Sequence, residues 1–113
     1  MEARIAASVL ASGLIRKAEG EGGFGAVLAK GDPTAGSILV ILLEKGGNPR
    51  LFERLLQPDG RYCWQEGGSQ RVENQREVPE FIARRRRFDP DLWVIELDIP
   101  SAERFAAEMN DLR

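Results

Sequence analysis

The chain has 113 residues, of which 42% are apolar and 30% are charged, and its formal net charge is −2. This length fits one domain, 1–113, that can bury a core without a metal ion or a disulfide, and the nearly balanced charge excludes a global attraction to nucleic acid or anionic lipid. The sequence contains no histidine, which excludes His-based catalytic triads and imidazole-ligated metal sites.

The N-terminal part of the chain predicts one helix and one strand. Residues 3–18 place apolar side chains at i and i+4, which is typical of an amphipathic helix. Three glycines, at 20, 22 and 23, are expected to end this helix. A strand is predicted over 24–30, and the turn sequence GDPTAG follows it at 31–36.

The middle of the chain predicts a three-stranded meander. Residues 37–43 are continuously apolar and rich in β-branched side chains, which is typical of a central strand covered on both faces. The short turns KGGNP and QPDG separate it from strands expected at 50–56 and 61–66, and loops this short favour antiparallel hairpins. Residues 67–77 are polar, and we expect them to form a loop.

The C-terminal part predicts a helix, a strand and a second helix. Pro79 suits the first turn of a helix that runs to about Arg87. FDPD ends that helix, apolar residues alternate over 92–98 as in a strand, and Ser101 can cap the last helix. The order predicts an α+β fold: a mainly antiparallel sheet of about five strands with an N-terminal helix, a helix before the last strand and a C-terminal helix. We expect helices on one face.

The segment ARRRRFDPDLWVIEL, 83–97, places four consecutive arginines before an acidic turn. Successive residues of an α-helix are about 100° apart, so these arginines point in four directions and do not form one patch. Arg85 lies one turn from the buried face, so its head is expected to find a carboxylate. The predicted structural ion-pair cluster is Arg85, Asp89, Asp91 and Glu96. The remaining arginines are expected to face solvent, where they form a candidate anion or partner contact: Arg84, Arg86 and Arg87.

Two aromatic motifs are possible binding surfaces. GGFGAVLA, 22–29, partly matches an RNA-recognition signature, but alanines occupy two positions where that signature needs base-stacking rings. Tyr62 and Trp64 lie on one strand face, which favours packing in the sheet over an exposed stacking surface. Cys63, the only cysteine, has no histidine to activate it, so nucleophilic catalysis is not expected.

Three stretches resemble one known family. FDPDLWVIEL near the C-terminus, GD-x-x-AGSILV at 31–40 and SGLIRKAEGEGGFG before it are together similar to domain-of-unknown-function family 1491, a family of small alphaproteobacterial proteins. Asp-Pro-Asp-Leu-Trp is the most specific of these elements. The resemblance implies a cytoplasmic bacterial protein and transfers no catalytic residue.

The leading hypothesis is a non-enzymatic protein-binding or regulatory domain that acts through an unknown protein partner or as a homodimer. It rests on the lack of histidine, of a metal-ligand cluster and of a cofactor loop, so no catalytic residue, metal or cofactor is assigned. The single cysteine and the short apolar runs predict a cytoplasmic protein with no membrane segment.

Two alternatives stay open. The first is nucleic-acid or polyanion binding through Arg84–Arg87, with help from Arg71 or Arg76. The second is a carboxylate-based enzyme, which requires three acids to share one open cleft. These acids are Asp89, Asp91 and Glu96.

Overall fold

The computed structural model describes residues 5–67 and 75–109. Its helices and strands follow the predicted order, and the class is α+β, as predicted. The elements are α1 (Ala7–Gly20), β1 (Phe24–Ala29), β2 (Ile38–Glu44), β3 (Gly47–Leu56), β4 (Tyr62–Glu66), a short 3-10 helix (Gln75–Glu77), α2 (Val78–Phe88), β5 (Trp93–Ile99) and α3 (Ala102–Met109). No helix among these residues is long and apolar enough to cross a membrane.

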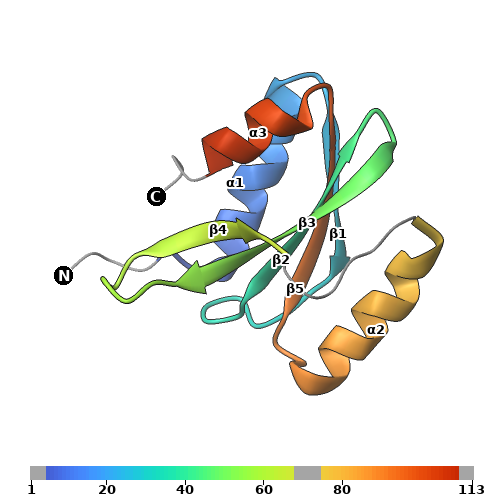
Figure 1. Cartoon of the computed structure of the whole chain (residues 1–113). Coiled ribbons are helices and arrows are strands. Elements are labelled where there is room, and N and C mark those ends of the chain that lie inside the picture. Colours follow the sequence, from blue (N-terminus) through green and yellow to red (C-terminus); the bar gives the residue numbers. More distant parts are fainter. Residues whose placement is uncertain (1–4, 68–74, 110–113) are drawn as a thin grey trace.

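The five strands form one sheet in the order β1-β5-β2-β3-β4 (Figure 1). β2, β3 and β4 make the predicted antiparallel meander. β5 enters between β1 and β2, antiparallel to β1 and parallel to β2. The sheet is therefore mainly antiparallel with one parallel pair, and the insertion of β5 leaves β1 as one edge strand and β4 as the other.

Helices cover both faces of this sheet, whereas the sequence led us to expect helices on one face. α1 and α3 lie on one side and α2 lies on the other (Figure 1). The reason is the apolar run of β2, whose successive side chains point to opposite faces. Val40 and Leu42 face α1 and α3, while Leu39 and Ile41 lie in the cluster under α2. A strand that is apolar on both faces needs cover on both.

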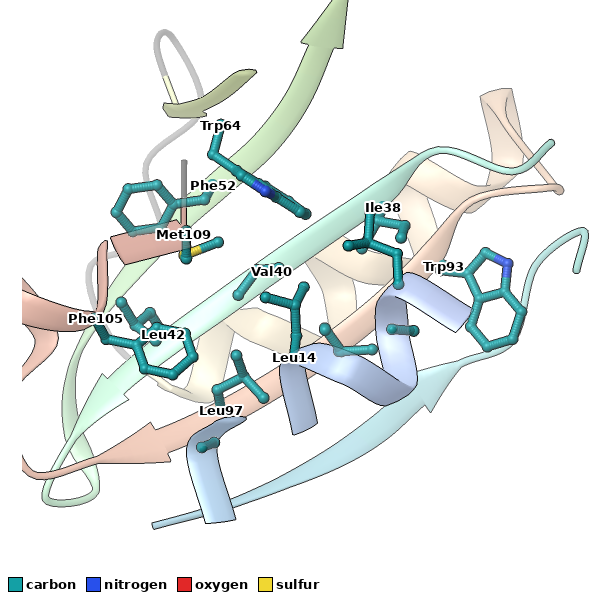
Figure 2. Close-up of a cluster of buried hydrophobic side chains, with 14 of the residues drawn as sticks. Leu14, Ile38, Val40, Leu42, Phe52, Trp64, Trp93, Leu97, Phe105 and Met109 are labelled. Atoms are coloured by element: carbon teal, nitrogen blue, oxygen red, sulfur yellow. The ribbon is translucent and has the colours of Figure 1, made fainter. Parts of the chain in front are cut away.

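The larger core lies between the sheet and the helices α1 and α3. Leu14 from α1 and Phe105 from α3 are fully buried, and Figure 2 shows them beside Val40, Leu42 and Leu97 of the sheet. Ser101 Oγ accepts a hydrogen bond from the Arg104 amide at 3.4 Å, which is the predicted cap of α3.

The aromatic pair on β4 belongs to the packed sheet and is not an exposed stacking surface. Trp64 is buried in the same cluster as Phe52 (Figure 2). Tyr62 is half-buried, and the guanidinium of Arg54 lies 4.3 Å from the centre of its ring. The packing that the sequence favoured for this pair is therefore present, and the pair offers no open platform for a base.

Candidate partner-binding surface

Arg85 forms an ion pair with Glu53 of β3, and not with the acids that follow it in the chain. α2 packs on the sheet face that carries Leu39 and Leu51, and Glu53 lies directly beside Leu39 in the sheet. The expected cluster with Asp89, Asp91 and Glu96 is therefore corrected. Arg85 and Glu53 are 32 residues apart in the sequence.

Arg86 is not a solvent-facing arginine. Its side chain is half-buried, and its Nη2 atom donates to the carbonyl oxygens of Lys30 at 2.8 Å and Pro90 at 3.1 Å. Lys30 directly follows β1, and Pro90 lies in the turn between α2 and β5. Arg86 therefore ties two segments of the fold together, and this end of its guanidinium is not free for an external anion.

The loop after β1 and the turn before β5 pack against each other so closely that side chains are excluded. A Cβ atom added to Gly31 would lie 2.0 Å from the carbonyl oxygen of Asp91, and one added to Gly36 would lie 2.4 Å from the same atom. The amide of Asp32 donates to this oxygen at 3.0 Å, and Trp93 Nε1 donates to the Asp32 carbonyl at 2.6 Å. We call this contact the loop joint.

The same loop also caps α1. The amides of Ala7 and Ser8, in the first turn of the helix, donate to the carbonyls of Thr34 and Pro33 at 3.2 and 3.0 Å. The amide donors at a helix start are the groups that would otherwise attract an anion. The loop thus uses these two amides internally, and GDPTAG is the structural turn that the sequence predicted.

Arg84 and Arg87 remain as the accessible part of the arginine run. Both are exposed, and neither forms an ion pair within the described residues. Residues three and four apart share a helix face, so Arg84 lies beside both Arg87 and Phe88, whose side chain is 83% exposed. Helical geometry scatters the run as a whole, but it unites these three residues.

The three acids of the enzyme hypothesis do not gather in one place. Asp89 Oδ1 accepts a hydrogen bond from the Asp91 amide at 3.2 Å, so it holds the turn. Glu96 lies farther along the chain, inside β5, and its separation from Asp91 corresponds to about 16 Å of extended backbone. Within residues 5–67 and 75–109, no group of three or more acidic or cysteine side chains could hold a metal ion.

The surroundings of Glu96 in β5 change its proton affinity. Partial burial, followed by the neighbouring charge of Asp98, raises the pKa of Glu96. A raised pKa in the folded state means that the folded chain binds the proton more tightly than the unfolded chain does. The charged form therefore costs stability, and stability falls as the pH rises from the unfolded-state pKa through the folded-state pKa.

Replacing Glu96 with glutamine should remove this cost. We expect Glu96→Gln to unfold at higher urea concentration than the wild type near neutral pH, because the amide carries no charge to desolvate. The difference should shrink as the pH falls below the ordinary glutamate range, where both side chains are neutral. Equal stability of the two proteins at neutral pH would contradict the role given to burial.

β1 is the feature that sequence reasoning missed. Its large side chains are open to solvent: Phe24 is 61%, Val27 43% and Leu28 42% exposed. The strand carries no charged residue, and beyond its pairing with β5 it pairs with no other described strand. The available signal was the uncharged sequence FGAVLA, but strand order was needed to recognise it as a sheet edge.

Comparison with known proteins identifies the family of the chain. Residues 5–107 match the model of a family described as a protein of unknown function (DUF1491). The chain belongs to the DUF1491 family. No protein with a curated description matches it.

Solved structures of similar proteins share the fold. A DUF1491 family protein from Caulobacter crescentus CB15, solved by crystallography, is 31% identical with a TM-score of 0.78, over 90% of this chain and 94% of that one. An NMR structure of a DUF1491 family protein from the same organism is 30% identical with a TM-score of 0.74, over 92% and 94%. Protein Atu0922 from A. tumefaciens is 27% identical with a TM-score of 0.74, over 91% and 92%.

The residues that carry the resemblance to DUF1491 proteins have a structural role here. GD-x-x-AG contributes Gly31 and Gly36, and Asp-Pro-Asp-Leu-Trp contributes Asp91 and Trp93. These residues meet in the loop joint. The most specific motifs of the chain are therefore two halves of one contact, and a functional surface has to be sought elsewhere.

Proposed function

We propose that this DUF1491 protein is a non-enzymatic, protein-binding domain of the cytoplasm, and that β1 is its binding edge. The observation that carries the proposal is the exposure of Phe24, Val27 and Leu28 on a strand with no charge. An edge strand offers unpaired amides and carbonyls to an added strand, and neighbouring apolar side chains provide the area that drives association.

Most of β1 lacks the features of a protected edge. Proteins that keep sheet edges from pairing place lysine, proline or a bulge there. β1 contains neither lysine nor proline, and its one irregularity lies between Val27 and Ala29. The stretch from Phe24 to Val27 is regular, so this part of the edge remains open for a partner strand.

Leu56 provides a matched control for Phe24. Both side chains are 61% exposed, but Leu56 ends β3 and lies far from β1 in the sheet order. We expect proteins retained from a lysate by the immobilised wild-type chain to be lost with Phe24→Lys and kept with Leu56→Lys. Retention of the same proteins by the Phe24→Lys variant would refute the role of β1.

Polyanion binding is the second candidate, and a specific observation favours it. Arg84, Arg87 and Phe88 form an exposed basic and aromatic corner at the end of α2, which suits a phosphate backbone and a stacked base. Arg86 is committed to the loop joint, Arg76 is exposed at the opposite end of the helix region, and Arg71 lies outside the described residues.

Salt dependence separates this candidate from nonspecific retention. If Arg84 and Arg87 contact phosphates, the wild-type chain should bind single-stranded RNA at low salt and lose affinity as salt rises. The double variant Arg84→Ala/Arg87→Ala should then show a weaker salt dependence, while Arg16→Ala, an exposed arginine of α1, should behave as the wild type. Absence of binding at low salt would eliminate the candidate.

A further inference from the structure

We infer that the occupant of the β1 edge is a second copy of this chain, and this inference rests on the proposed function of β1. The two β1 strands would run antiparallel about a two-fold axis at Ala26, which would join two five-stranded sheets into one. A two-fold interface requires a surface that complements itself. The side chains of β1 and the charges on either side of the strand meet that requirement.

Exposed apolar side chains of the two copies meet in this register. In an antiparallel pair centred on Ala26, Gly25 of one copy lies opposite Val27 of the other, and Phe24 lies near Leu28. Gly25 and Val27 face the same side of the sheet, since they pair with Leu97 and Ile95 of β5. Leu97 and Ile15 of the same chain fill the space beside Gly25, so the branched side chain of Val27, 43% exposed, would pack on these apolar side chains of the second copy.

The charges beside β1 are complementary in the same register. Lys30 follows the strand directly, and Glu19 and Glu21 precede it. Antiparallel pairing brings the Lys30 end of one β1 strand toward the Gly22 end of the other, next to this acidic turn. Glu21 already bonds Lys17 at 2.7 Å, whereas Glu19 is exposed and has no ion pair among residues 5–67 and 75–109. Glu19 is the partner available to Lys30, twice per dimer.

One observation favours a second copy of this chain over an unrelated peptide as the partner of β1. Both halves of the charge match lie at the two ends of the apolar strand, so the complementary strand already exists in the sequence. An unrelated peptide would have to supply an acidic end, a basic end and apolar side chains between them. The second copy supplies all three.

The first experiment measures molecular mass by light scattering over a wide dilution series. The wild-type chain should have twice the monomer mass of 12.6 kDa at high concentration. Ala26→Lys should halve that mass, because it places two like charges directly opposite each other. Ala26 is exposed, so the variant should still fold. Phe24→Lys should also be monomeric, and Leu56→Lys should stay dimeric.

The second experiment tests the register with a cysteine. Directly opposed residues of antiparallel strands have Cβ atoms about 4.5 to 5.5 Å apart, close to the range that a disulfide bridges. Ala26→Cys in a Cys63→Ser background should therefore form a disulfide-linked dimer under mild oxidation. Ser12→Cys in the same background, at an exposed position of α1, should remain a monomer on a non-reducing gel.

The outcomes distinguish this inference from the function on which it rests. A wild-type chain that is monomeric at every concentration, or a dimer that persists in both Ala26→Lys and Phe24→Lys, would overturn the inference. A different outcome is a monomeric chain in which Phe24→Lys abolishes capture of another protein. In that case β1 is still the binding edge, but its partner is not a second copy of the chain. A dimer that is lost only in the β1 variants supports both.

Discussion

Replacing Gly31 with alanine is expected to lower the free energy of unfolding by about 3 kcal/mol. The added Cβ atom would lie 2.0 Å from the Asp91 carbonyl oxygen and 2.6 Å from its carbon. Both atoms are backbone, so no side-chain rotation can relieve the overlap, and the loop must move away from the turn before β5. Urea unfolding followed by tryptophan fluorescence measures the change, since Trp93 lies in this joint.

The same substitution at Gly13 is expected to change the unfolding free energy in the opposite direction. This glycine lies inside α1, and a Cβ atom added there would meet nothing within 4 Å. Alanine is favoured over glycine in a helix interior by about 1 kcal/mol, so Gly13→Ala should raise the unfolding free energy. If both variants lost stability equally, the steric account of the loop joint would be wrong.

Replacing Phe105 with alanine is expected to cost about 3 to 5 kcal/mol of unfolding free energy. The ring is 0% exposed and lies in the main core between α3 and the sheet (Figure 2). Truncation removes its burial and leaves a cavity that the rigid sheet cannot fully close. Chemical denaturation measures the change. A lower midpoint with an unchanged slope of unfolding free energy against denaturant concentration would show a loss of stability alone.

Phe88 is the control for that prediction. Its ring is 83% exposed at the end of α2, so Phe88→Ala should change the unfolding free energy by no more than about 0.5 kcal/mol. The same variant bears on the second candidate function, because it removes the aromatic part of the basic corner at Arg84 and Arg87. A large loss of stability in Phe88→Ala would show that this ring is packed in solution.

The loop joint changes where function is expected in this protein. Its glycines and Trp93 hold the end of β1 against the start of β5, and Arg86 adds hydrogen bonds to the same place. These groups are engaged with one another. The side chains that are open to a partner lie instead on β1 and at the end of α2.

Local patterns were sufficient to predict the order of the elements. Period-2 alternation and continuous apolar runs identified the strands, and glycines and prolines marked most of their limits, because these signals depend on neighbouring residues. The limit expected after KGGNP was wrong, since β3 begins at Gly47 and contains Pro49. The run Ile38–Leu43 also predicted a strand that is covered on both faces, and both faces of β2 are buried. The predicted meander and the α+β class followed from the same local rules.

Contacts between distant segments could not be read in this way. The insertion of β5 beside β1 decides that FGAVLA is a sheet edge, and the position of α2 over β3 decides that Arg85 meets Glu53. Both depend on which residues become neighbours across more than thirty positions of chain, as the 32-residue separation of Arg85 and Glu53 illustrates.

The sequence by itself determined the elements, their order and the absence of histidine chemistry in this protein. Only the tertiary structure decided that Arg86 is engaged and that β1 is an uncovered apolar edge, whereas helical geometry had already predicted that Arg84 and Arg87 face solvent. The physical reason is that the preference for helix or strand arises from adjacent residues, whereas exposure and pairing arise when packing brings remote segments together.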